Sequence, residues 1–176
     1  VVDSSNILSV TQKYSQNGGN LNLLFSGEAN SKLDAATYDI KNANLIYIPV
    51  YQNNQDLILE KDKIDIDLGE ISEYLNNFNS VTTKDTNTLN LEVSENKKSI
   101  LVSKKTNAYL PSSGNQSINN AIENLLNDVV LDKSNNKNNQ YKEFFGALDT
   151  TSTEQFNRTL DSLDERSSIS NINNII

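Results

Sequence analysis

The sequence predicts a mainly β protein with α-helices at its C-terminus. Through the first two thirds of the chain, short runs rich in Val, Ile, Leu and Tyr alternate with turns rich in Asn, Asp and Gly, which is the pattern of short strands. After Ser117 apolar residues recur every three or four positions, which is the period of a helix. About one residue in six is Asn, and Asn tolerates the left-handed conformation that tight turns need. We therefore expect a β-rich body followed by a helical appendage.

Several short segments are predicted to be strands. They lie at residues 6–10, 21–25, 45–51, 56–59, 63–68, 88–93 and 99–103. The last two are joined by five residues, 94–98, and a loop of this length predicts a hairpin. Segment 70–78 differs from its neighbours because its apolar residues have helical spacing, which favours one short helix. These residues are Ile71, Tyr74, Leu75 and Phe78.

The first two predicted helices follow Ser117. Ser117 is a candidate N-cap, and the apolar face of the first helix runs over residues 118–129. A polar loop is expected at 132–140. The second helix is then marked by aromatic and aliphatic residues from Tyr141 onward and is predicted to end near Asp149.

A third helix is predicted to begin within TSTEQFNRTL. Thr151 with Glu154, and Ser152 with Gln155, both have the spacing of a capping box. The tail 169–176 again has apolar residues at helical spacing, so a further helix is expected to begin there. The apolar residues of the three helices are the candidate functional residues, as a structural cap: Ile118, Ile122, Leu125, Leu126, Phe144, Phe145, Leu148, Phe156, Leu160 and Leu163.

Composition argues against several classes of function. The net charge is −8 and the sequence pI is about 4.5, whereas nucleic-acid binding needs clustered Lys and Arg. The chain has no His and no Cys, so the common catalytic triads and imidazole or thiolate zinc sites are excluded, and we expect no catalytic residues, metal or cofactor. No apolar run is long enough for a membrane-spanning helix. The chain also has no Met, which predicts that it is part of a longer protein.

Three groups of residues invite a functional interpretation beside a structural one. Residues 62–70 contain Asp62, Asp65 and Asp67 before a Gly, as in a calcium loop, but their alternation with apolar residues favours a strand. Tyr38, Tyr47 and Tyr51 suit a sugar-stacking platform, but packing within strands is the favoured interpretation. The Lys residues of 94–105 are interpreted as protection of a strand edge rather than as a binding site.

The helical part of the chain resembles the C-terminal end of a bacterial autotransporter passenger. The residues that carry this resemblance are INNAIENLL (118–126), FFGAL (144–148) and TSTEQFNRTLDSL (151–163), in this order and with polar gaps between them. Upstream, residues 18–50 and 89–109 are similar to the end of the stem in autotransporters that carry a subtilisin-like serine protease. The parent is then expected to be a serine protease, with its catalytic residues N-terminal to this chain.

The resemblance implies a fold, a function and a location. Residues 1–113 would form the end of a right-handed parallel β-helix, with a β-sandwich as the alternative. Residues 114–176 would form a helical cap and linker that leads toward an outer-membrane barrel outside this chain. The implied function is a non-catalytic stem and autochaperone, or junction, for folding of the passenger at the bacterial cell surface or in its secreted form, tethered to the outer membrane in the parent. The alternative is an adhesin module that recognises a host protein or glycan.

The expected partners follow from the same resemblance. They are the chain's own N-terminal passenger and C-terminal barrel, and a host surface protein or glycan if the adhesin alternative holds. No nucleic acid is expected. The strand near ILSV (7–10) would lie at an exposed edge, so self-association through this N-terminal edge is also predicted.

Overall fold

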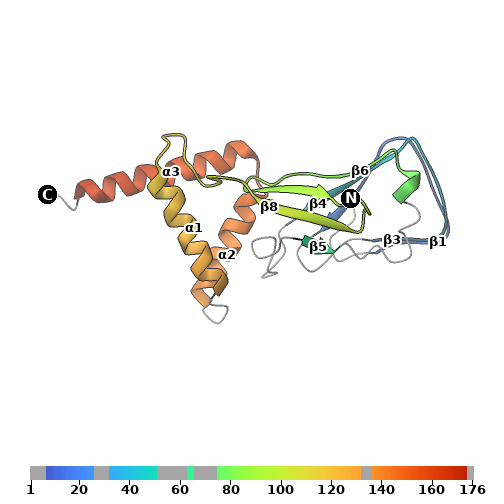
Figure 1. Ribbon diagram of the computed structural model, residues 1–176, viewed down its shortest axis with the longest axis horizontal. Helices are drawn as coiled ribbons and strands as arrows, with labels where there is room; N and C mark the ends of the chain where they lie inside the picture. Colours follow the sequence, from blue (N-terminus) through green and yellow to red (C-terminus); the bar gives the residue numbers. More distant parts are fainter. Residues whose placement is uncertain (1–6, 26–31, 51–62, 66–74, 132–135, 174–176) are drawn as a thin grey trace. The chain divides into compact units, whose positions relative to one another are not determined.

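The computed structural model describes residues 7–25, 32–50, 63–65, 75–131 and 136–173 (Figure 1). The chain forms two compact units. Unit 1 comprises residues 1–86 and 90–103, and unit 2 comprises residues 87–89 and 104–176. The chain therefore enters unit 2 briefly at 87–89, returns to unit 1, and then completes unit 2 with the helices.

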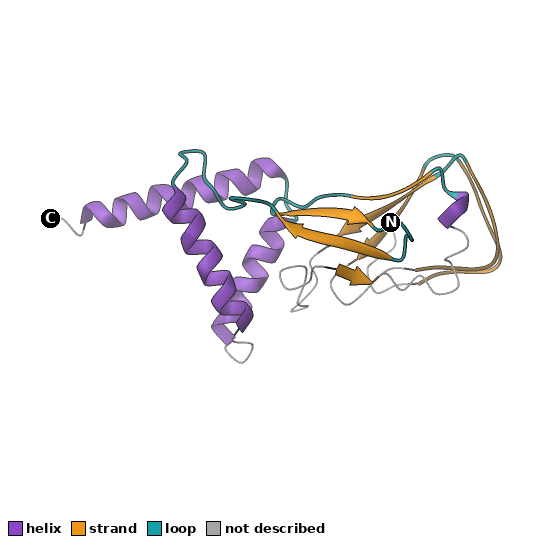
Figure 2. Ribbon diagram, viewed as in Figure 1, coloured by secondary structure: helices purple, strands orange, loops and turns teal. Residues whose placement is uncertain are grey.

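The described strands form three small sheets (Figure 2). One sheet pairs β1 with β3, the second has the order β2-β4-β6, and the pairings determined in both are parallel. In the third sheet, of order β5-β8-β7, strand β5 runs antiparallel to β8. The strands are β1 (Ile7–Asn17), β2 (Asn20–Phe25), β3 (Lys32–Lys41), β4 (Asn44–Pro49), β5 (Lys63–Asp65), β6 (Ser80–Thr83), β7 (Leu89–Val93) and β8 (Ser99–Lys104).

Polar side chains connect the three parallel strands of the second sheet. Asn44 Nδ2 donates to Asn20 Oδ1 at 3.1 Å, and Ser80 Oγ donates to Asn44 Oδ1 at 2.9 Å. These three residues, which we call the polar ladder, are also register partners in the backbone pairing. The turn that precedes Asn20 contains Gly18 and Gly19 with φ of 80° and 75°, a conformation that glycine adopts without steric cost. The ladder therefore fixes the point at which each strand begins.

The second sheet contributes several side chains to the core of unit 1. Leu45 and Tyr47 on β4 are 1% and 0% exposed, and they alternate with less buried neighbours, as one face of a strand requires. The ring of Phe25 meets that of Tyr47 edge-on, with centroids 6.5 Å apart. Both strands were predicted from their β-branched and aromatic residues, bounded by Asn, Asp and Gly, and the prediction is confirmed.

The described residues of unit 2 form three helices: α1 (Gln116–Leu131), α2 (Asn136–Asp149) and α3 (Thr153–Asn173). The N-cap of α1 is Asn115, whose side-chain oxygen accepts the Ser117 N–H at 3.1 Å, so the predicted cap at Ser117 is wrong by two positions. Helix α2 begins within the predicted polar loop, and α3 continues through the start of the tail as one helix. None of the described helices is both long and apolar enough to span a bilayer.

The predicted fold class is wrong. The expectation was a mainly β protein that ends a right-handed parallel β-helix, or a β-sandwich, capped by short helices. The described residues instead form small mixed sheets, parallel and antiparallel, with three helices of 16, 14 and 21 residues. The helices are longer than predicted because the polar segments 136–140 and 164–168 lack the apolar periodicity that marks a helix in sequence.

Two strands were missed and one predicted strand lies outside the described residues. Strand β3 contains Asp34, Ala35 and Ala36, residue types with weak β propensity, so pairing with β1 overrides local preference. Strand β6 is only four residues long. Of the predicted helix at 70–78, residues 75–77 form a single 3-10 turn. Segment 56–59 and residues 70–74 lie outside the described residues.

Candidate functional site at the corner between helices α2 and α3

Helix α2 ends and helix α3 begins within a short polar corner. The Thr151 hydroxyl donates to the carbonyl of Leu148 at 2.7 Å, and this interaction satisfies part of the C-terminus of α2. Ser152 Oγ accepts the Gln155 N–H at 3.3 Å, so Ser152 is the N-cap of α3 and this half of the predicted capping box is confirmed. The Thr151 side chain therefore stabilises the helix before it rather than the one after it.

A residue far away in sequence completes the corner. Asn87 Nδ2 donates to the carbonyls of Leu148, Asp149 and Thr151 at 3.4, 3.0 and 3.0 Å. Its backbone N–H also donates to the carbonyl of Asp149 at 3.1 Å, and its Oδ1 accepts the Thr153 hydroxyl at 3.1 Å. The Asn87 amide therefore uses both its donors and its acceptor on this corner.

The contact is reciprocal. Asp149 Oδ1 accepts the backbone N–H of Thr88 at 2.6 Å, and Asp149 is only 7% exposed. We call Asn87, Thr88 and Asp149 the latch. The last carbonyls of a helix have no partner within the helix and carry the negative end of its dipole. A neutral amide donor at Asn87 is suited to this environment because it brings hydrogen bonds without a negative charge.

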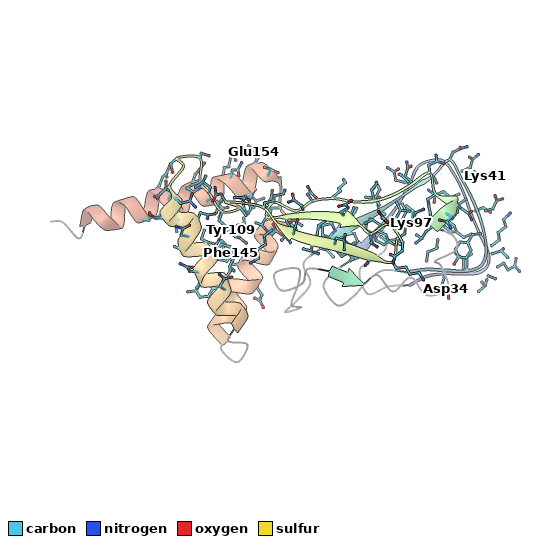
Figure 3. All side chains as sticks on the ribbon, in the orientation of Figure 1. Asp34, Lys41, Lys97, Tyr109, Phe145 and Glu154 are labelled. Atoms are coloured by element: carbon cyan, nitrogen blue, oxygen red, sulfur yellow. The ribbon has the colours of Figure 1, made fainter. Side chains whose placement is uncertain are left out.

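Tyr109 anchors a second chain segment in unit 2 (Figure 3). Its backbone N–H donates to the Oδ1 of Asn119, a residue that is 1% exposed, at 2.9 Å. Its ring meets Phe145 edge-on at 5.8 Å and is tilted against Phe156 at 6.2 Å. Burial raises the pKa of the Tyr109 hydroxyl, and the nearby carboxylate of Asp149 raises it further. The Tyr109 hydroxyl is therefore protonated, and its ring forms part of the helical core.

The latch and Tyr109 flank the two ends of the β7–β8 hairpin. Thr88 immediately precedes β7, and its carbonyl accepts the N–H of Lys105, which immediately follows β8, at 2.8 Å. Residues 87–89 and 104–109 both belong to unit 2. The entry and the exit of this hairpin are therefore held by the unit that contains the helices.

A third contact joins the loop before α1 to α3. The Ser112 N–H and hydroxyl donate to the two carboxylate oxygens of Asp161 at 2.7 and 2.9 Å. Ser113 Oγ and Asn115 Nδ2 donate to the two oxygens of Asp164 at 2.7 and 2.6 Å. These donors, Ser113 first, hold the pKa of Asp164 below its ordinary value of 3.8.

This pKa shift predicts a pH dependence of unit 2. A carboxyl group whose pKa is lower in the folded state stabilises that state fully above its unfolded pKa of 3.8, and the stabilisation is lost as the pH falls through the lower folded pKa. Urea unfolding of wild type and Asp164→Asn, measured across this acid range, should show a shallower decline of stability in the variant. Glu165→Gln is the control because it removes a carboxylate from the same helix without breaking these hydrogen bonds. Parallel curves for wild type and Asp164→Asn would refute the assignment.

Unit 2 holds all the candidate cap residues. Six are buried: Ile122, Leu126, Phe145, Leu148, Phe156 and Leu160. Three are half-buried: Ile118, Leu125 and Leu163. Phe144 is 47% exposed. Their role as a cap stays a prediction, because their burial shows only that they pack within the helical unit.

Sequence reasoning missed the latch residues. Asn87 and Asp149 lie about sixty positions apart, and no periodicity connects them. One signal was present in the sequence. A carboxylate at the last position of a predicted helix is opposed by the helix dipole, so Asp149 needed a hydrogen-bond donor from elsewhere in the chain.

The other sequence candidates do not assemble into a site. Tyr47 is buried within unit 1, as strand packing predicts, and Tyr38 lies beside Tyr14, with ring centroids 6.4 Å apart. Lys97 Nζ lies 3.4 Å from the Leu75 carbonyl and 3.3 Å from the Asn76 side chain. Of residues 62–70, only β5 is described, and Tyr51 lies outside the described residues. Within the described part of the chain, no cluster of three His, Cys, Asp or Glu residues could hold a metal ion.

Tyr47 and Tyr38, both in unit 1, are expected to respond in opposite ways to the loss of the hydroxyl group. The Tyr47 hydroxyl is buried with no hydrogen-bond partner among the described residues, so Tyr47→Phe should raise the free energy of unfolding by about 1 kcal/mol. The Tyr38 hydroxyl accepts the Ala35 N–H at 2.7 Å and donates to the Leu33 carbonyl at 3.3 Å, so Tyr38→Phe should lower it by about 1 kcal/mol. Urea unfolding of both variants checks this. Destabilisation by Tyr47→Phe would show that its hydroxyl has a partner.

No family model, curated protein or solved structure matches this chain. The corner between α2 and α3 presents backbone carbonyls, a carboxylate and a helix N-terminus to a strand-flanking segment of the same chain. This arrangement can hold and orient polypeptide.

Proposed function

We propose that this chain is a non-catalytic segment near the C-terminus of a secreted autotransporter passenger, and that unit 2 is its folding junction, or autochaperone. The observation that carries the proposal is the hold of unit 2 on both ends of the β7–β8 hairpin, through the latch and through the pairing of Thr88 with Lys105. The parent protein would be displayed at the bacterial surface, and its activity would reside in its N-terminal part.

The order of folding explains why such a hold is useful. Helices form from local contacts on a microsecond timescale, whereas pairing of strands distant in sequence is slow because a long loop must close first. Outside the cell no ATP-driven chaperone assists this step. A helical unit that folds first and captures residues 87–89 and 104–109 brings the two ends of the hairpin together. Capture of the two ends closes this segment into a loop, so the entropy cost of loop closure no longer opposes the pairing of β7 with β8.

The hold also fixes register. Asn87 and Thr88 make side-chain and backbone hydrogen bonds to one corner, so the residue at which β7 begins is determined by unit 2. A shift of one residue would turn every side chain of a strand to the opposite face. Leu89 and Leu91 on β7 are 1% and 7% exposed, with Asn90 exposed between them. The latch thus selects the register that buries these leucines.

The test is display of the parent protein at the cell surface. Asn87→Asp should sharply reduce the protease-resistant passenger on intact cells, and deletion of residues 116–163 should abolish it. Asn157→Asp is the matched control, because Asn157 is exposed on α3. Normal, protease-resistant display of the deletion would overturn the proposed function. The assignment to autotransporters is tested separately by the flanking sequence, where alternating strands of about ten residues are expected after Ile176.

A further inference from the structure

The connection between β1 and β2 contains the only Asn-Gly pair in the sequence, Asn17 and Gly18. We call residues 17–20 the β1–β2 turn. Asn17 is the last residue of β1 and is exposed to solvent. Glycine has no side chain to keep its backbone nitrogen away from the amide of a preceding asparagine. Asn17 is therefore the asparagine at which we expect deamidation to be intrinsically fastest.

Deamidation of this pair proceeds through a cyclic imide. The Gly18 nitrogen loses its proton to solvent base and attacks Cγ of Asn17, so that a C–N bond forms while Nδ2 leaves as ammonia. Water then opens the imide at one of its two carbonyls. Opening at Cγ gives aspartate with an ordinary peptide bond. Opening at the backbone carbonyl gives isoaspartate, in which the main chain runs through Cβ and Cγ and is one atom longer.

Hydrogen bonds within unit 1 oppose the first step. The Gly18 N–H donates to the carbonyl of Lys41 at 2.7 Å, and Lys41 is the last residue of β3 (Figure 3). The Gly18 carbonyl accepts Nε2 of Gln16 at 3.1 Å, and the Gly19 carbonyl accepts the N–H of Asn44 at 2.9 Å. Because a carbonyl holds the Gly18 proton, solvent base removes that proton only when the turn opens.

We propose that Asn17 is a deamidation site that the folded β1–β2 turn protects, and that isoaspartate at this position keeps the turn from closing again. When closing is fast, the rate of such a reaction follows the fraction of chains in which the segment is open. Modified Asn17 then marks chains that have opened here. The proposal does not depend on the autotransporter assignment or on the folding role of unit 2, because these residues belong to unit 1.

The register of the strands explains why isoaspartate would hinder closing. Asn17 pairs with Lys41, and Asn20 pairs with Asn44, so the two neighbouring turns have the same number of residues between their paired positions. Isoaspartate adds one main-chain atom to only one of these turns. Either the end of β1 or the start of the polar ladder must then lose its register.

Peptide mass spectrometry of the whole chain, incubated in mildly alkaline solution with and without urea, tests the protection. In urea Asn17 should deamidate before every other asparagine, and without urea its rate should fall by about tenfold or more. Asn44→Ala removes the hydrogen bond to Asn20 beside the turn, so it should speed the reaction without urea and leave the rate in urea unchanged. Asn90→Ala is the matched control, because Asn90 is exposed on β7, and it should change neither rate.

Refolding of the modified chains tests the effect of the longer main chain. Isoaspartate chains are isolated after reaction in urea and returned to buffer beside Asn17→Asp chains, which carry the same charge on an ordinary main chain. The Asn44 N–H, which donates to Gly19, should exchange with deuterium faster in the isoaspartate chains and at the wild-type rate in Asn17→Asp.

Four results would overturn the proposal. They are equal deamidation rates with and without urea, faster reaction of another asparagine in urea, no effect of Asn44→Ala, and equal exchange of the Asn44 N–H in the isoaspartate and Asn17→Asp chains.

Discussion

Replacement of Asn87 by Asp is expected to lower the free energy of unfolding of unit 2 by about 2–4 kcal/mol. The substitution keeps the shape of the side chain. It replaces the amide that donates to the Asp149 and Thr151 carbonyls with a carboxylate that only accepts. The new charge also lies at the negative end of the α2 dipole. Urea unfolding followed by the helical circular dichroism signal measures the change.

The control for this prediction is Asn157→Asp. Asn157 is an exposed residue of α3, so the same chemical change there should alter stability by less than about 0.5 kcal/mol. Amide hydrogen exchange should show faster exchange of the Thr88 N–H in the Asn87→Asp chain. This N–H donates to the carboxylate of Asp149, and the hydrogen bond from Asn87 to the Asp149 carbonyl holds that residue in place. Equal stabilities of the two variants would show that the latch does not contribute to folding.

Truncation of Phe156 to Ala is expected to destabilise unit 2 by about 3–5 kcal/mol. Phe156 is 4% exposed and lies against the ring of Tyr109, which in turn contacts Phe145. Removal of this ring leaves a cavity beside a buried tyrosine, and the surrounding helices can close it only in part. Thermal and urea unfolding, again followed by helical circular dichroism, provide the measurement.

Phe144→Ala is the matched control on the same set of helices. Phe144 is half exposed, and at concentrations where the chain is monomeric its truncation should change stability by less than about 1 kcal/mol. The sequence placed both phenylalanines among the cap candidates, so the pair separates a core residue from a surface residue. Similar losses for the two variants would contradict the packing described for unit 2.

The sequence correctly predicted the helices and strands that are marked by residues within or next to them. The β-branched and aromatic residues of LIYIP predicted β4, the loop 94–98 predicted the hairpin, and Ser152 with Gln155 predicted the start of α3. Each of these signals lies within a few residues of the element it marks. The fold class depends instead on which strands pair, and pairing such as Leu33 with Leu8 leaves no local trace.

Only the apolar residues of the candidate site could be predicted from the sequence. Helical periodicity placed Phe145, Phe156 and Leu160 on the apolar faces of two predicted helices, and all three are buried. The polar half depends on Asn87, which is one of many Asn residues and has no distinguishing neighbours in sequence. Its role arises because the carbonyls at the end of α2 need donors and the fold places Asn87 beside them.

The polar ladder has a consequence for how this chain tolerates changes in length. Asn20 pairs with Asn44 and Asn44 with Ser80, steps of 24 and 36 residues. The same contact is therefore made after connections that differ by a dozen residues. Insertions and deletions in the segments that connect the ladder strands should be nearly neutral during evolution. Loss of one residue within β2, β4 or β6 would instead shift the register of every later residue in that strand. Homologues of this unit should therefore share the sequences of these strands but differ in the lengths of the connections between them.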